Sequence, residues 1–238
     1  MLLRILLTLS ALAATSAAQA HGIWVAQRHG DLAVVYGHGA SDEAYAPQKI
    51  KAAVSHLASG EAREAKIVPQ PRNVLVEPVQ DSTVLTVVLD NGVWTKRADG
   101  KSVNKPKRDV PDAQSASHSI KTTTAILSRG GPLRPTGLAL EIVPLVDPMQ
   151  LKMGDDLPVQ VFSEGKPLAG VALNTDYLND SHAMSAKTDG NGKTTLFVRN
   201  DGLNVIGVAH VKQTPDNPEV DQVSYFATLS FSLQHTDE

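Results

Sequence analysis

Apolar and polar positions alternate with a period of about two along most of the chain, which is typical of half-buried β-strands. No segment keeps the helical period of about 3.6 over several turns. Glycine, asparagine and aspartate cluster between the alternating segments, as in turns. The pattern predicts strands at residues 23–27, 32–36, 50–57, 74–76, 84–89, 138–145, 159–162, 196–198, 205–209 and 225–233. Turns are predicted at His29-Gly30, Ser59-Gly60, Asp90-Asn91-Gly92, Glu164-Gly165, 189–192 and Asp201-Gly202.

Short strands at this spacing predict an all-β protein made of two tandem β-sandwiches, immunoglobulin-like or transthyretin-like. The glycine- and proline-rich stretch "SRGGPLRPTG", residues 128–137, lies between the two halves. We therefore expect one domain at residues 21–130 and a second at 138–238. Residues 95–119 are polar and rich in lysine and arginine. They are predicted to form a solvated loop or, alternatively, a docking patch for an acidic partner.

The first 20 residues have the pattern of a secretory signal peptide. Arg4 precedes an apolar run at residues 5–14, and Ala18-Gln19-Ala20 is a small-x-small cleavage site. Cleavage after Ala20 would make His21 the first residue of a periplasmic or secreted protein. No later stretch reaches the roughly 18 apolar residues of a membrane span, so no membrane insertion is expected.

Composition excludes several classes of function. The formal net charge of −3, without long basic blocks, argues against nucleic acid as a partner. The chain has no cysteine, so a metal could be held only by nitrogen and oxygen ligands. Nucleophile-elbow, H-E-x-x-H and phosphate-loop motifs are absent, and the chain is predicted not to be an enzyme.

The segment "AHGIWVAQRHGDLAVVYGHG" predicts a hairpin whose two-residue loop is His29-Gly30. In this register Arg28 faces Asp31, an opposite-charge pair that favours the alignment. Counting outward from the loop, His21 faces His38 in a non-hydrogen-bonded pair. Such pairs bring Cα atoms to ~4.5 Å with both side chains on one face, so the two imidazoles should converge.

Cleavage before His21 would add its α-amine to these two imidazoles. The amine and its own ring close a chelate, and His38 supplies a further nitrogen ligand. Three such nitrogens in roughly one plane suit Cu(II) or Ni(II). Cleavage after Ala18 would instead place His21 third from a free amine, an arrangement that favours the same metals. His118, after the polar segment, and His210, at the end of a strand, are further candidate ligands.

A resemblance to a known family rests on four segments of the sequence. They are "AHGIWV", "VVYGHGASDEAYAPQKI", "GLALEIVPLVDPMQLKMGDDLPVQVFSEGKPLAGVALNTDY" and "KTDGNGKTTLFVRNDGLNVIGVAH". The chain resembles the secreted bacterial family named domain of unknown function 4198, often labelled nickel uptake transporter family proteins. The C-terminal half is also similar to carboxypeptidase-regulatory-like β-sandwiches. The resemblance implies a periplasmic accessory protein of Ni(II) or Co(II) uptake beside a membrane metal transporter, with His21 as the ligand that fits by position.

Two other functions remain open. The tandem sandwiches could be a metal-free binding or structural module at the cell surface. An N-terminal histidine paired with another histidine also occurs in copper redox enzymes that cut polysaccharides. Those enzymes usually present aromatic side chains on a flat face, whereas this chain is only 4% aromatic.

Overall fold

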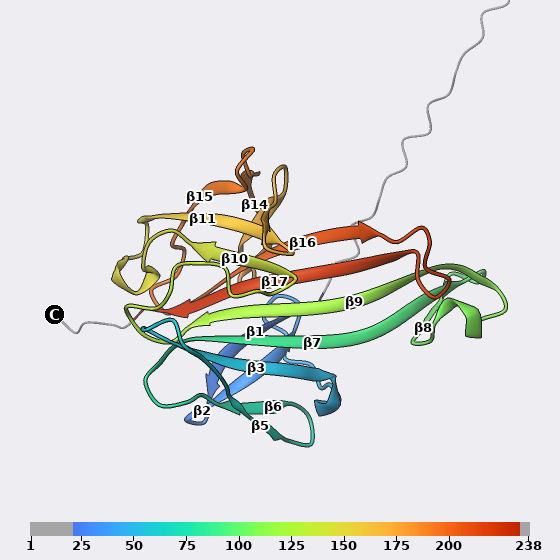
Figure 1. Cartoon of the computed structure of the whole chain (residues 1–238), viewed down its shortest axis with the longest axis horizontal. Coiled ribbons are helices and arrows are strands. Elements are labelled where there is room, and N and C mark those ends of the chain that lie inside the picture. Colours follow the sequence, from blue (N-terminus) through green and yellow to red (C-terminus); the bar gives the residue numbers. More distant parts are fainter. Residues whose placement is uncertain (1–20, 234–238) are drawn as a thin grey trace, which may run out of the picture.

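The structure is a computed structural model that describes residues 21–233. The predicted signal peptide, residues 1–20, lies outside the described residues. The fold is all-β, as predicted, and consists of three stacked sheets (Figure 1). Each predicted strand overlaps an observed one. Within residues 21–233, no helix is long and apolar enough to cross a membrane.

A nine-stranded sheet forms the middle layer and is called the large sheet below. Its strands, in spatial order, are β14 (Asp180–Lys187), β13 (Ala172–Asp176), β16 (Leu203–Gln213), β17 (Gln222–Ser232), β9 (Ala113–Ile126), β7 (Ser82–Arg97), β3 (Ile50–Leu57) and β4 (Ala62–Glu64), with β8 (Ser102–Val103) paired to β7.

A four-stranded sheet covers each face of the large sheet, drawn below and above it in Figure 1. The lower sheet contains β1 (Gly22–Arg28), β2 (Asp31–Gly37), β6 (Val74–Glu77) and β5 (Lys66–Pro69). The upper sheet contains β10 (Leu140–Pro144), β11 (Asp156–Ser163), β12 (Lys166–Pro167) and β15 (Lys193–Phe197). The connections include short 3-10 helices, η1 (Pro47–Lys49), η2 (Lys107–Asp109) and η3 (Pro148–Gln150).

Because both faces of the large sheet are covered, hydrophobic core lies on each side of it. Under the upper sheet, aliphatic side chains of β10 and β11 pack on β16 and β17. Under the lower sheet, β1, β2 and β6 pack on β3 and β7. A separate aromatic cluster connects β1 with β16 and β17 through Trp24, Tyr177 and Phe226. The β1–β2 hairpin is therefore anchored on the large sheet by its apolar residues.

The large sheet contains strands from both predicted domains. Strand β9 precedes the predicted boundary at residues 128–137, and β17 follows it. The two strands pair in parallel, from Ser117 opposite Gln222 to Ile126 opposite Phe231. The two halves of the chain therefore share one sheet. The division at residues 21–130 and 138–238 stays a prediction.

The predicted loop at residues 95–119 is wrong at both of its ends, whereas residues 98–112 connect two strands and contain only one short strand, β8. Strand β7 continues to Arg97, and β9 begins at Ala113. The predicted turn at residues 90–92 is also wrong, because these residues lie inside β7. The β7–β9 register shifts between Asp90 and Val93, and Gly92 has φ +80°, so the glycine belongs to a β-bulge.

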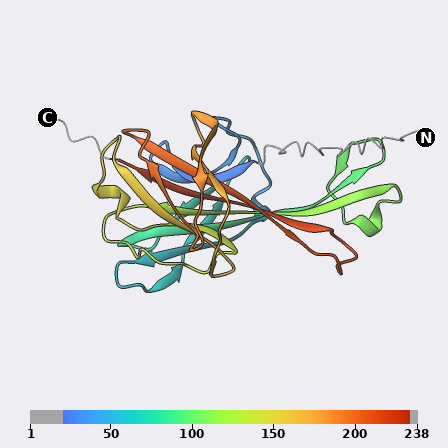
Figure 2. The ribbon, with the colours of Figure 1, turned by 90° about the horizontal axis from the view of Figure 1, so that it is seen from above.

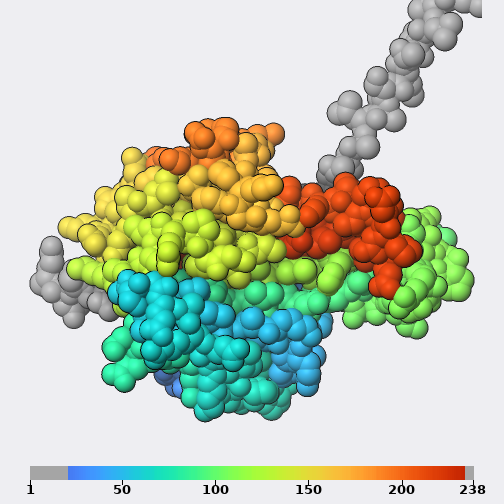
Figure 3. All heavy atoms as spheres, viewed as in Figure 1, coloured from blue at the N-terminus to red at the C-terminus, as the bar shows by residue number. Residues whose placement is uncertain are grey.

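The ends of β7, β9, β16 and β17 extend beyond both covering sheets and form an arm (Figure 2). In Figure 3 this narrow end combines green and red atoms, because the middle and the end of the chain meet there. Three basic side chains of residues 95–119 form ion pairs within the arm: Arg97 with Asp112, Lys107 with Asp221, and Arg108 with Glu219. Their charges are thus already paired inside the chain.

Candidate metal centre

The β1–β2 hairpin has the predicted register. His29 and Gly30 form the turn with φ values of 52° and 95°, as a two-residue type I′ turn requires. Arg28 pairs with Asp31, and the ladder ends at Gly22 opposite Gly37. His21 and His38 follow directly beyond this last pair. Their ring centroids are 6.5 Å apart at an interplanar angle of 67°, so the predicted convergence of the two imidazoles is confirmed.

Tyr177 from the β13–β14 turn inserts its hydroxyl into the end of this hairpin. Gly22 N donates a hydrogen bond to the Tyr177 hydroxyl at 2.8 Å, and the hydroxyl donates to Gly37 O at 2.9 Å. A side chain at Gly22 would be obstructed, because a Cβ there would lie 2.8 Å from Cε1 of Phe226. The glycine thus allows the hairpin end, and with it the histidine pair, to rest on the large sheet.

The His21 ring is held between an aromatic ring and a carboxylate. It stacks on Tyr36 with a centroid distance of 5.2 Å and an angle of 7°. Its Nε2 lies 2.9 Å from Oε1 of Glu43. An ionised carboxylate can only accept, so Nε2 carries a hydrogen, and Nδ1 is the nitrogen left to bind a metal. The two side chains are 37% and 48% exposed, so this contact orients the ring and adds little stability.

The surroundings of His38 favour the neutral form of its ring. Its backbone N–H donates to Ser41 Oγ at 2.7 Å, and this hydroxyl donates to Glu43 at 3.3 Å. Its Nδ1 is buried and has no hydrogen-bond partner among the described residues. Burial lowers the pKa of His38, the neighbouring His21 and His182 lower it further, and Glu43 opposes them. The neutral ring that results is the form that binds a metal.

The side chains alone do not complete a metal site. Among residues 21–233, no group of three or more histidine, cysteine, aspartate or glutamate side chains is arranged to hold a metal ion. Two imidazoles converge, and the Nδ1 atom of His38, which has no hydrogen-bond partner among the described residues, is one nitrogen that could bind a metal. The donor set therefore fits a metal only if the backbone nitrogen of His21 is a free amine, as cleavage after Ala20 would make it.

His118 does not join this centre. Its Nε2 lies 2.7 Å from Oδ1 of Asp90, in an ion pair. Lys121, on the same strand, has its ammonium 5.7 Å from the ring centroid of Phe226, which packs against Gly22. Lys121 thus points toward the hairpin. Side chains three positions apart on a strand point to opposite faces, so His118 points toward the upper face.

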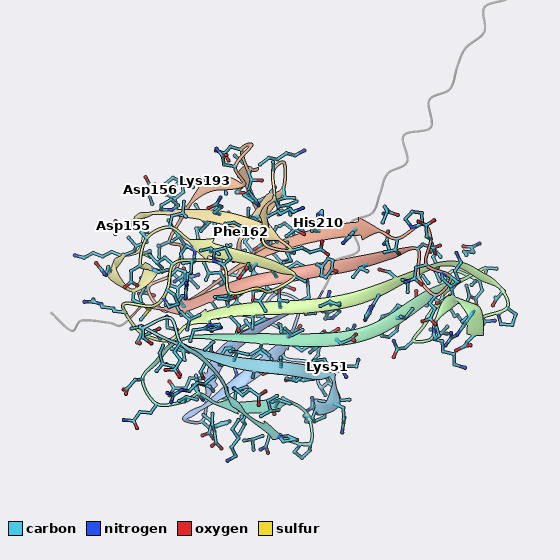
Figure 4. The ribbon with its side chains drawn as sticks, in the orientation of Figure 1. Lys51, Asp155, Asp156, Phe162, Lys193 and His210 are labelled. Carbon is cyan, nitrogen blue, oxygen red and sulfur yellow. The ribbon has the colours of Figure 1, made fainter. Side chains whose placement is uncertain are left out.

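His210 does not join the metal centre either, because its side chain also points toward the upper face. It lies on β16 opposite Tyr225 (Figure 4). Three residues earlier on this strand, Gly207 faces Phe226 and Tyr177 on the lower side. The alternation of β16 then directs His210 to the upper side. Of the four predicted ligands, the structure brings together His21 and His38 only.

Three residues near the pair are not among the ligands that the sequence predicts: Glu43, Tyr177 and His182. Glu43 follows His38 closely in the chain, and a carboxylate there was a signal for a partner of His21. Tyr177 is 155 residues from Gly22, to which it is bonded, and no local pattern marks it. His182, at the start of β14, affects the pKa of His38 although the segment was not predicted as a strand.

The fold and the site together define an all-β protein with a histidine pair at the end of a hairpin. The chain belongs to the family described as Domain of unknown function (DUF4198), whose model matches residues 18–212. It is similar to a protein of Haemophilus influenzae (strain ATCC 51907 / DSM 11121 / KW20 / Rd) named "Uncharacterized protein". The two are 26% identical over 234 residues, which cover 97% of this chain and 98% of that protein. No solved structure matches the chain.

Proposed function

We propose that the protein is a periplasmic or secreted accessory protein of metal uptake that binds a transition-metal ion through His21 and His38. The observation that carries the proposal is the placement of the two imidazoles, 6.5 Å apart at the end of one hairpin. The contact between His21 Nε2 and Glu43 supports it, because metal-binding histidines commonly donate their other N–H to a carboxylate. The ion is the cargo of the protein, and a membrane metal transporter is its proposed partner.

The proposed ligands are the free α-amine of His21, its Nδ1 and the His38 ring. An α-amine has a pKa near about 8, so its deprotonation by a metal costs little at neutral pH. Three nitrogen donors suit Ni(II), Co(II) and Cu(II), and Cu(II) should bind most tightly in vitro whatever the cellular cargo. Growth under nickel, cobalt or copper limitation would identify that cargo.

The test compares two proteins that differ only at the N-terminus. One begins with His21, and the other carries an additional methionine before it, which blocks the amine. Titration with Cu(II), Ni(II) or Co(II) should give binding tighter than micromolar for the first. The additional residue should weaken it at least tenfold, which corresponds to ~1.4 kcal/mol. N-terminal sequencing of the exported protein should find His21 first.

His38→Ala should weaken binding by at least the same factor, whereas His210→Ala is the control and should bind as the parent does. Binding no tighter than micromolar with a free His21 would overturn the proposal and favour a metal-free module. Reduction of oxygen by the copper-loaded protein in the presence of a reductant would overturn the accessory role and favour a copper redox enzyme.

A further inference from the structure

The turn between β13 and β14 lies against the histidine pair. The Tyr177 ring packs edge-on against His38, with a centroid distance of 5.7 Å and an angle of 87°. The carbonyl oxygen of Leu178 would lie 3.7 Å from a Cβ at Gly39. Asp176 and Asp180 pair across the turn, so β14 starts directly beside the metal centre.

Strand β14 is the outermost strand of the large sheet, so no other described strand pairs with it along one of its edges. Its side chains alternate between half-buried and exposed positions, and His182 and Met184 are both exposed. The Met184 side chain is 57% exposed, so its thioether is accessible from solvent. Ser181, Ala183 and Ser185 are half-buried whereas His182 and Met184 between them are exposed, so both of these side chains point toward solvent.

His182 lies near the start of β14, two residues before Met184. Its backbone N–H donates to Oδ1 of Asp180 at 3.2 Å, which ties it to the turn. The pairing of β13 with β14 is irregular between Asn174 opposite Met184 and Asp176 opposite Asp180. Bulges of this kind redirect side chains and are frequent beside functional sites. His182 contributes to lowering the pKa of His38, and the turn before β14 is held against His38 by the Tyr177 ring.

We propose that His182 and Met184 form a Cu(I)-binding site beside the His21–His38 centre. A thioether is a soft, polarizable ligand that selects Cu(I), whereas Ni(II) and Co(II) gain little from it. The His21–His38 centre offers only nitrogen donors, which suit the divalent ions. This inference rests on the proposed function, and it specifies copper as the cargo, with Cu(I) bound at the exposed edge of the large sheet.

The test measures Cu(I) binding to the protein that begins with His21, without oxygen, in competition with the chelator bicinchoninate. Met184→Leu and His182→Ala should each weaken Cu(I) binding at least tenfold. Met153→Leu is the matched control, because Met153 is also exposed, at 62%, but lies in the turn before β11. It should leave Cu(I) affinity unchanged. X-ray absorption should detect a copper–sulfur distance that disappears in Met184→Leu.

The two proposals fail in different ways. Because the Cu(I) site does not use the α-amine, an alanine placed before His21, which blocks the amine without adding a thioether, should leave Cu(I) affinity unchanged while it weakens Cu(II) binding. Unchanged Cu(I) affinity in Met184→Leu, or no Cu(I) binding at all, would overturn this inference and leave Cu(II) and Ni(II) binding at His21 intact. Absence of divalent binding, with Cu(I) binding that depends on Met184, would instead overturn the nitrogen centre.

Discussion

The two faces of the large sheet are both covered, but they are built differently. The upper face carries a continuous core of aliphatic and aromatic side chains, contributed by Leu140, Ile142, Leu157, Val159, Leu173 and Leu229 among others. Both faces also bury hydroxyl groups: under the upper sheet Thr122 Oγ1 donates to Leu140 O at 2.6 Å, and under the lower sheet Thr228 Oγ1 donates to Ile23 O at 2.6 Å. The lower face in addition buries a cation, since Lys121 is only 3% exposed. Both faces supply apolar packing, and the lower face also buries this charge and positions the histidine pair.

The largest expected effect is a loss of stability that leaves metal affinity unchanged. Leu157 is fully buried in the upper core. Leu157→Ala should lower the free energy of unfolding by ~2–5 kcal/mol, because it removes apolar contacts and leaves a cavity. Denaturant unfolding measures this loss. Metal affinity, titrated under conditions where the variant is folded, should not change, and a tenfold change would contradict the separate roles of the two faces.

The second effect concerns the buried cation of the lower face. Burial lowers the pKa of Lys121 from 10.5 to about 8, and Lys121 makes no ion pair with another described residue. Between these two values the unfolded chain holds a proton that the folded protein has lost. The free energy of unfolding should therefore rise with pH from about 8 to about 10.5, by about 3 kcal/mol from this group.

Lys121→Met is the variant that tests this effect. At pH 7 it should be more stable than the parent by about 3 kcal/mol, since it removes a buried charge without a carboxylate partner. The difference between the two proteins should shrink as pH rises through the same window. Denaturant unfolding at several pH values measures it, and a variant less stable than the parent at pH 7 would show that the ammonium contributes favourably.

The third effect is smaller and specific to the metal centre. Tyr177→Phe removes the hydroxyl between Gly22 and Gly37, leaving two buried backbone groups without their partner. It should cost ~1–3 kcal/mol of stability. Because the hairpin end is then held less firmly, metal affinity should fall about tenfold, or ~1.4 kcal/mol.

Tyr45→Phe is the matched control for this variant. The Tyr45 hydroxyl also connects two backbone groups of the lower sheet, since it donates to Val34 O at 2.8 Å and accepts from Val74 N at 3.1 Å. It should lose similar stability and keep its metal affinity. Equal metal affinities in the two variants would show that the Tyr177 hydroxyl does not position the pair.

The smallest expected effect is that of replacing His118, whose side chain points toward the upper face. The His118 and Asp90 side chains are 30% and 31% exposed. His118→Ala should change the free energy of unfolding by less than about 1 kcal/mol, as expected for a partly exposed ion pair. Metal titration should give the parent affinity. Weakened metal binding would place His118 in the centre and contradict the alternation along β9.

Sequence prediction worked best where pairing is local. The His29-Gly30 turn fixes the register of β1 and β2, and strict alternation carries that register to His21 and His38. It worked worst for β9, a long strand with a polar first half that pairs in parallel with β17 about 100 residues later. Asp90, Asn91 and Gly92 are residue types that are common in turns, but here they form a bulge in β7 opposite β9.

The sequence by itself determined the all-β class and the hairpin that sets the two imidazoles side by side, because a two-residue turn and an alternating pattern act over few residues. Only the tertiary structure decided that Tyr177 and β14 lie against this pair and that His118 and His210 face away. Those outcomes depend on which sheet covers which face of the large sheet. That choice is made by packing between segments far apart in the chain, for which no local pattern exists.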